Sequence, residues 1–263
     1  MPSAYDGTDI ISYLQSKYII RQRRISYRVS DISLKNLVIY DIINLTGGVI
    51  MFDYILFDLD GTITKSEQGI VNSVIYALKE FGINETDREK LKAFIGPPLD
   101  ASFMKYYGFD ACKAKKAVEY YRVYYKDKGI FEAPLYKDVK QTLITLKSMG
   151  KRLFLATSKP TVFAKQILEH WEIDGFFEDA VGSNLDGTRV KKDEVITEVL
   201  NSNRISDRSK VLMVGDREHD ILGAKKVGIK SVGVLYGYGD LDELNSAGAD
   251  FIIENIGDII NIV

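Results

Sequence analysis

The chain of 263 residues is poor in the residues on which several specialised classes of protein depend. Its single cysteine, Cys112, excludes an intramolecular disulfide and fits a reducing compartment. Two histidines, His170 and His219, are too few for a histidine-based metal site. The formal net charge of −2 gives no electrostatic reason to expect a nucleic acid polymer as partner.

Long apolar runs are also missing from the sequence. No run is long enough to cross a bilayer, and no signal-peptide pattern stands at the start. We therefore expect a cytoplasmic protein without a membrane partner. A content of 46% hydrophobic residues is enough for a substantial core.

Short apolar segments of strand length recur along the chain, and helical patterns fill most of the intervals. The strand candidates are Tyr54–Phe57, Arg152–Ala156, Lys210–Val214, Ser231–Leu235 and Phe251–Ile253. This alternation predicts an α/β fold with a Rossmann-like parallel sheet flanked by helices. Ligands of such sheets bind beyond the carboxyl ends of the strands, so the residues of a functional site are expected there.

The segment Asp58-Leu59-Asp60-Gly61-Thr62 directly follows the first predicted strand. Because strand side chains alternate, Asp58 and Asp60 are expected to project to the same side. Close carboxylates repel, so the pair indicates a cation, a shared proton or a protonated general acid. Gly61 permits a sharp turn here, although Asp-Gly is also an ordinary turn dipeptide.

Two further segments offer groups that could hold a phosphate. Thr157 and Ser158 follow the second strand and precede Pro160, which is expected to open the helix Thr161 to His170. A helix N-terminus beside hydroxyls is a natural phosphate seat, although the same residues also suit a plain helix cap. Farther along, Lys192 precedes an acidic helical turn, and we expect it, rather than its neighbour Lys191, to reach the phosphate.

In a fourth segment, Gly215-Asp216 directly follows the predicted strand Lys210–Val214. Asp220 lies four residues farther on, in the first turn of a predicted helix that is expected to end at Gly228. Oxygen ligands from Asp58, Asp60 and Asp216 suit magnesium better than zinc. Asp220 is either a direct ligand or a helix N-terminal charge.

Taken together, the four segments resemble those of haloacid dehalogenase superfamily phosphatases of the phosphoglycolate-phosphatase-like branch, in order, character and spacing, over roughly residues 51–263. Two other segments strengthen the resemblance to bacterial phosphoglycolate phosphatases and 5′-nucleotidases: Gly182 to Arg189 and Tyr236-Gly237-Tyr238-Gly239. The resemblance implies Mg²⁺-dependent hydrolysis of a small phosphomonoester, phosphoglycolate or a nucleoside 5′-monophosphate, through an aspartyl phosphate.

The resemblance also implies roles for individual residues. Asp58 would be the nucleophile, and Asp60 would protonate the leaving alcohol and later activate water. Mg²⁺ would be bound by the Asp58 carboxylate, the Asp60 backbone carbonyl and Asp216, with Asp220 as a further candidate. The residues that would hold the phosphate are Gly61, Thr157, Ser158 through its backbone, and Lys192.

An inserted α-helical cap is predicted for residues 66–134, with the α/β core formed by 51–65 and 135–263. Apolar residues such as Ile70, Val71 and Val74 there follow a helical rather than a strand pattern. The resemblance implies that this cap closes over the phosphate pocket and selects the leaving group. The segment Ile95–Leu99, rich in glycine and proline, is expected to enter the pocket, although it could be a simple loop.

Tyrosines and basic residues interleave in the second half of the predicted cap. Spacings of four residues, as between Tyr121 and Tyr125, favour packing faces of one helix over a nucleic-acid surface. One of these tyrosines could still stack on the base of a nucleotide substrate.

Residues 1–50 carry none of the catalytic segments and contain a small basic cluster. We expect a non-native or loosely ordered extension, with an extra docking element as the alternative. Rapid proteolytic trimming to near Met51 with full activity would exclude docking.

Two rival functions remain open from the sequence. A β-phosphoglucomutase-like phosphomutase would use the same aspartyl phosphate but return the group to a sugar. The other is a non-catalytic binding protein on the same fold, although the presence of Asp58, Asp60, Lys192 and Asp216 counts against it.

Overall fold

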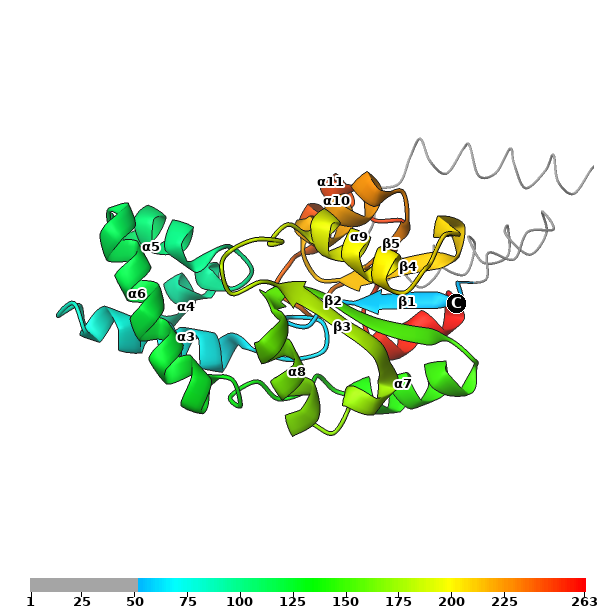
Figure 1. The fold of residues 1–263 in the computed structure, drawn as a ribbon, viewed down its shortest axis with the longest axis horizontal. Coiled ribbons are helices and arrows are strands. Elements are labelled where there is room, and N and C mark those ends of the chain that lie inside the picture. Colours follow the sequence, from blue (N-terminus) through cyan, green and yellow to red (C-terminus); the bar gives the residue numbers. More distant parts are fainter. Residues whose placement is uncertain (1–51) are drawn as a thin grey trace, which may run out of the picture. The chain divides into compact units, whose positions relative to one another are not determined.

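The structure is a computed structural model and describes residues 52–263. The predictions made for residues 1–50 lie outside this part of the chain. Within it, six parallel strands form one sheet in the order β3-β2-β1-β4-β5-β6 (Figure 1). The strands are β1 (Tyr54–Phe57), β2 (Arg152–Pro160), β3 (Phe177–Ser183), β4 (Val211–Gly215), β5 (Lys230–Val234) and β6 (Phe251–Ile253).

Helices cover both faces of the sheet (Figure 1). One face carries α9 (Lys192–Ser202), α10 (Glu218–Val227) and α11 (Leu241–Ala247), and the other carries α7 (Val139–Ser148), α8 (Thr161–His170) and the 3₁₀ helix η6 (Ile256–Asn261). Successive residues of β1 alternate between these layers, because Leu56 belongs to one buried cluster and both Ile55 and Phe57 to the other. The predicted α/β fold with a parallel sheet flanked by helices is confirmed.

The strand order places a topological switch at the centre of the sheet. From β1 the chain builds β2 and β3 on one side and then crosses to β4, which pairs with β1 on its other side. The carboxyl ends of β1 and β4 therefore lie side by side, with the helical connections leaving in different directions. Parallel α/β sheets bind their ligands in the crevice at such a point.

Two strands differ from the sequence prediction by more than one residue, whereas the bounds of β4 and β5 are shifted by one. The edge strand β3 was missed, and β2 runs on to Pro160, with an irregular register between Ala156 and Pro160. Pro160 therefore ends the strand and immediately precedes α8, instead of opening the helix. A single turn of 3₁₀ helix, η4 (Asp174–Phe176), leads into β3, and another, η5 (Arg208–Lys210), leads into β4.

Between β1 and α7 the structure contains helices and no further strand of the sheet. They are α3 (Glu67–Lys79), α4 (Arg88–Leu91), the 3₁₀ helix η2 (Lys92–Phe94), α5 (Leu99–Tyr107), α6 (Ala111–Tyr124) and the π-helical turn η3 (Tyr125–Gly129). Figure 1 shows this group beside the carboxyl ends of the strands. We call it the cap, since it occupies the predicted stretch 66–134. Its independence from the core as a domain stays a prediction.

The two chain segments that connect the cap to the core run antiparallel. The Lys65 amide donates a hydrogen bond to the Pro134 carbonyl (2.8 Å), and the Tyr136 amide donates one to the Ile63 carbonyl (3.1 Å). The Trp171 indole adds a hydrogen bond to the Ala133 carbonyl (2.9 Å). These bonds fix where the cap joins the core. Across residues 52–263, no helix combines the length and the apolar character that a membrane crossing requires.

Candidate active site

Three carboxylates meet at the switch point of the sheet. Asp58 follows β1, Asp216 follows β4, and Asp220 lies in the first turn of α10, which Gly228 ends in a left-handed conformation. One oxygen from each of the three carboxylates lies within 4.8 Å of the other two, and all three residues are buried. The structure thus brings together three of the four predicted metal-binding residues through their carboxylates.

Lys192 supplies the positive charge next to these carboxylates. Its Nζ atom lies 2.8 Å from Asp58 Oδ1 and 2.8 Å from Asp220 Oδ1, and it donates a hydrogen bond to the Ala156 carbonyl (3.1 Å). Burial alone would lower the pKa of Lys192, but the carboxylates of Asp220 and Asp58 raise it overall, so the ammonium stays charged. Lys191, in contrast, is exposed.

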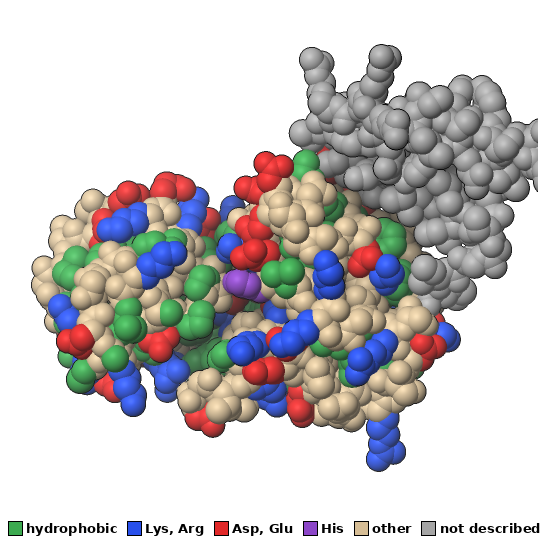
Figure 2. Space-filling view, turned by 90° about the horizontal axis from the view of Figure 1, so that it is seen from above, with side chains coloured by type: hydrophobic (Ala, Val, Ile, Leu, Met, Phe, Trp, Pro, Cys, Tyr) green, Lys and Arg blue, Asp and Glu red, His purple; other side chains and the backbone are tan. Residues whose placement is uncertain are grey.

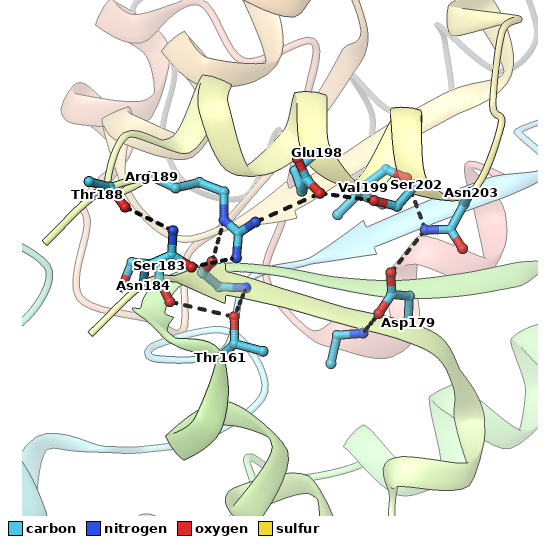
Figure 3. Close-up of polar contacts among 12 residues, drawn as sticks. Thr161, Asp179, Ser183, Asn184, Thr188, Arg189, Glu198, Val199, Ser202 and Asn203 are labelled. Carbon is cyan, nitrogen blue, oxygen red and sulfur yellow. Dashed lines mark hydrogen bonds and ion pairs between the residues drawn. The ribbon is translucent and has the colours of Figure 1, made fainter. Parts of the chain in front are cut away.

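The loop between β3 and α9, which delivers Lys192, is held by its own polar side chains (Figure 3). Asn184 donates a hydrogen bond to the Thr188 hydroxyl (2.8 Å). Arg189 donates through Nε to the Gly182 carbonyl (2.9 Å) and through Nη2 to Asn184 Oδ1 (3.1 Å), and it lies 3.8 Å from Glu198 of α9. These bonds tie the end of β3 to the start of α9 and so fix the position from which Lys192 extends.

The Asp60 carboxylate pairs with a different lysine from the one that pairs with Asp58. Its Oδ2 atom lies 2.8 Å from the Nζ atom of Lys159, whose side chain is only 6% exposed. Burial would lower the pKa of Lys159, but Asp60 and then Tyr125 raise it overall. Lys159 was not predicted from the sequence as a site residue, although it directly follows the two predicted phosphate-binding residues.

Those two residues, Thr157 and Ser158, lie at the irregular end of β2, just before α8. Thr157 is buried, and its hydroxyl accepts a hydrogen bond from the Lys159 amide (3.3 Å), while Ser158 is partly exposed. The neighbouring Ala156 carbonyl is the one that binds Lys192, so this end of β2 borders the site.

Glycines make room for Asp216. Gly61 has a φ of 85°, and a Cβ atom built there would stand 2.1 Å from Asp216 Oδ2; one at Gly237 would stand 2.3 Å from Asp216 Cβ. The residues that follow these glycines hold the Asp216 carboxylate. The Tyr238 amide donates a hydrogen bond to Asp216 Oδ2 (2.8 Å), and the Thr62 hydroxyl lies 3.4 Å from Oδ1. The Tyr236–Gly239 segment, noticed only as a resemblance to relatives, is therefore part of the site.

Groups of the protein compensate the negative charge of the site's carboxylates only in part. Asp60 Oδ1 is buried and accepts no hydrogen bond from residues 52–263, while the buried Asp58 Oδ1 and Asp220 Oδ1 share the single ammonium group of Lys192. Burial, followed by the neighbouring carboxylates, raises the pKa of Asp216. Burial also raises the pKa of Asp220, with Lys192 opposing the shift. An oxygen-only, electron-rich cluster of this kind fits a hard divalent cation.

Replacing Gly61 by alanine tests this packing. The new methyl group would collide with Asp216, and a positive φ is itself unfavourable for alanine. We expect a loss of about 2–4 kcal/mol in the free energy of unfolding and weakened Mg²⁺ binding. Gly82→Ala is the matched control, because Gly82 has a φ of 72° but nothing lies within 4 Å of where its Cβ atom would stand. Equal losses of stability in urea titrations of the two variants would contradict the role of Gly61 in accommodating Asp216.

The cap contacts the core next to the site through one end of the segment Ile95–Leu99. The Arg217 guanidinium, next to Asp216 in the chain, lies 3.4 Å through Nη1 from the Ile95 carbonyl and donates through Nε to Glu243 (2.8 Å). The Ile95 end of the segment Ile95–Leu99 therefore contacts the core next to Asp216, and entry of this segment into the pocket stays a prediction. Figure 2 shows a recess between the cap and the core in this region, bordered by charged side chains.

Comparison with known protein families agrees with this geometry. The family described as haloacid dehalogenase-like hydrolase matches residues 55–234, which include all four predicted segments. The chain belongs to this family. The family resemblance inferred from the sequence is confirmed.

Individual relatives differ in the activities for which they are named. A 5′-nucleotidase of Pseudomonas aeruginosa is 44% identical over 202 residues, 77% of this chain and 91% of that one. The tyrosine-protein kinase PtkA of Mycobacterium tuberculosis is 34% identical over 199 residues, 75% of this chain and 67% of that one. The crystal structure of a predicted phosphatase from Clostridium acetobutylicum has 46% identity and a TM-score of 0.75, and covers 80% of this chain and 97% of that one. Other relatives are named phosphoglycolate phosphatase.

The prediction of an enzyme, a phosphoric monoester hydrolase of the haloacid dehalogenase-like family, is confirmed by these relatives. The roles of the individual site residues stay predictions, which the geometry allows us to refine.

Proposed function

We propose that the protein is a Mg²⁺-dependent phosphatase that hydrolyses phosphoglycolate or a nucleoside 5′-monophosphate through an aspartyl phosphate on Asp58. The observation that carries this proposal is the buried cluster of Asp58, Asp216 and Asp220 with Lys192 at the switch point of the sheet. Such a cluster of like charges is costly to bury, and its persistence is explained by a site that binds a cation and an anionic substrate.

In the first step, a carboxylate oxygen of Asp58 attacks phosphorus, and the bond between phosphorus and the leaving oxygen breaks. Asp60 donates its proton to that oxygen, so the leaving group departs as an alcohol. In the second step, Asp60 takes a proton from water, which attacks the phosphorus and releases phosphate from Asp58. At the end of the cycle Asp58 is again a free carboxylate and Asp60 again carries its proton.

The remaining residues position and neutralise the phosphoryl group. Lys192 lies next to the attacking carboxylate and offsets negative charge on the phosphoryl oxygens, and Thr157 and the Ser158 backbone offer hydrogen bonds from the end of β2. Gly61 contributes by letting its backbone pass close to Asp216.

The metal would be held by Asp58, the Asp60 carbonyl and Asp216. Asp220 is a further candidate ligand, although Lys192 and the Arg217 amide already contact its two oxygens. When bound, Mg²⁺ supplies electrostatic stabilisation of charge on the phosphoryl oxygens.

The relatives support both leading substrates. The 44% identical relative is named 5′-nucleotidase, whereas other relatives are named phosphoglycolate phosphatase. The rival phosphomutase reaction differs from hydrolysis in the acceptor of the phosphoryl group, which is a sugar hydroxyl instead of water.

A panel of phosphomonoesters tests the proposal. We expect phosphate release from phosphoglycolate or a nucleoside 5′-monophosphate in Mg²⁺ and loss of that release with EDTA. Conversion of a hexose 1-phosphate into its 6-phosphate isomer without phosphate release would favour the phosphomutase instead. No turnover of any member of the panel would favour a binding protein.

Because the pKa of Asp216 is raised, the increase in thermal stability on adding Mg²⁺ is expected to depend on pH. A carboxyl group whose pKa is higher in the folded than in the unfolded protein stabilises the fold below the unfolded pKa, and that stability is lost as pH rises through the folded pKa. Mg²⁺ favours the ionised carboxylates and removes this penalty. The gain in Tm on adding Mg²⁺ should therefore grow as pH rises from about 5 to about 8. A gain that stays constant or shrinks with pH, or that persists in Asp216→Asn, would contradict this assignment.

A further inference from the structure

Lys159 has no role in the mechanism so far, yet it is deeply buried beside the acid/base. Its Nζ atom lies 2.8 Å from Asp60 Oδ2 and donates a hydrogen bond to the Tyr125 hydroxyl (2.7 Å). A buried ammonium is costly unless it is paired and hydrogen-bonded. These two partners therefore determine where the Lys159 side chain lies.

The two carboxylate oxygens of Asp60 are in different environments. Oδ2 contacts Lys159, whereas Oδ1 is buried and accepts no hydrogen bond from the described part of the chain. Holding Oδ2 restricts rotation of the carboxyl group about its terminal torsion, which is otherwise broad. Oδ1 is then the oxygen available for proton transfer to the leaving group.

Tyr125 reaches Lys159 from the cap. It is the first residue of the π-helical turn η3, a type of turn that occurs frequently at functional sites. Its ring stacks on Tyr121, with 5.3 Å between centroids and 14° between planes, and meets Phe163 of α8 edge to face at 5.5 Å. Lys159 Nζ lies 4.8 Å from the centroid of the Tyr125 ring, so the ring offers a cation–π contact in addition to the hydrogen bond.

We propose that Lys159 positions the Asp60 carboxylate and that Tyr125 holds Lys159 from the cap, so that the acid/base is oriented only while this tyrosine is docked on the core. Both are positioning residues that act through Asp60. The inference rests on the proposed phosphatase function.

The consequence is a dependence on the leaving group. An alkyl phosphate needs a proton from Asp60 as its alcohol departs, whereas 4-nitrophenyl phosphate releases a stable anion and does not. Mispositioning of Asp60 should therefore slow phosphorylation by the first substrate more than by the second. In this two-step reaction, kcat/KM reports the steps up to release of the alcohol, so it isolates the effect from the later use of Asp60 as a base.

The experiment compares kcat/KM in the full-length enzyme with Mg²⁺ for two substrates. One is the alkyl phosphate, phosphoglycolate or a nucleoside 5′-monophosphate, that the wild type hydrolyses faster, and the other is 4-nitrophenyl phosphate. For Lys159→Met we expect a loss of about 10²–10³-fold on the alkyl phosphate and less than about tenfold on 4-nitrophenyl phosphate. Tyr125→Phe keeps the ring and removes the hydroxyl, so we expect the same preference with a smaller loss, about tenfold on the alkyl phosphate.

Tyr124→Phe is the matched control. It removes a hydroxyl that donates a hydrogen bond to Glu132 (3.2 Å) in the same part of the cap and should leave both values unchanged. Equal losses on the two substrates in Lys159→Met and Tyr125→Phe, or no loss in either, would overturn the inference while leaving the phosphatase assignment intact. A wild-type enzyme that hydrolyses neither substrate would instead overturn the proposed function.

Discussion

Replacing Asp58 by asparagine is expected to lower kcat for phosphomonoester hydrolysis by roughly 10⁴- to 10⁶-fold, since an amide cannot accept the phosphoryl group from the substrate. The fold should survive, because asparagine has nearly the same shape and the substitution removes one of three mutually repelling carboxylates. The measurement is steady-state phosphate release in Mg²⁺, together with thermal unfolding.

Asp53→Asn is the control for this substitution. Asp53 precedes β1 at the opposite end of the strand and pairs with Lys210 (2.8 Å) on the surface, so its loss should leave kcat unchanged. If Asp58→Asn retained near-normal phosphate release while Asp53→Asn behaved as the wild type, Asp58 would not be the nucleophile.

Replacing Lys192 by methionine is expected to cause the second large effect, this time on stability as well as activity. Removal of the ammonium leaves Asp58 and Asp220 buried without their cation, which in other proteins costs about 3–5 kcal/mol. Substrate turnover should also fall by about 10²–10³-fold because the charge next to the phosphoryl group is lost.

Lys191→Met provides the matched comparison for Lys192→Met. The two lysines are adjacent in the chain, but Lys191 is exposed and Lys192 is buried. Urea unfolding without metal measures the stability difference, and addition of Mg²⁺ should restore part of the stability lost in Lys192→Met. Similar unfolding free energies for the two variants would contradict the structural role of Lys192.

The central part of the site could be predicted from the sequence because it depends on local features that a parallel sheet brings together. Asp58 and Asp216 each follow a short apolar strand, and the carboxyl ends of neighbouring parallel strands share one edge. Asp220 follows from helical spacing, and Lys192 from the start of a helix. For the three aspartates, whose side chains are short, the backbone position nearly determines where the carboxylate can reach.

Features that depend on contacts between distant segments could not be predicted from the sequence. The edge strand β3 carries Glu178 and Asp179 near its start, so it lacks the continuous apolar run of the central strands. The contact of Lys159 with Asp60 and Tyr125 joins three separate segments, and a flexible lysine gives no sign in the sequence of the direction it takes. The amide of Tyr238 likewise reaches Asp216 only because glycines flank it and let the chain return to the site.

Chemical trapping of the phosphorylated enzyme tests the central claim most directly. Borohydride reduces an acyl phosphate to an alcohol, so acid-quenched enzyme taken during turnover and treated with labelled borohydride should carry the label on the side chain of residue 58. Peptide mapping by mass spectrometry should locate it there in the wild type and find none in Asp58→Asn. Label at another residue, or an unlabelled enzyme under conditions of active turnover, would contradict an aspartyl phosphate on Asp58.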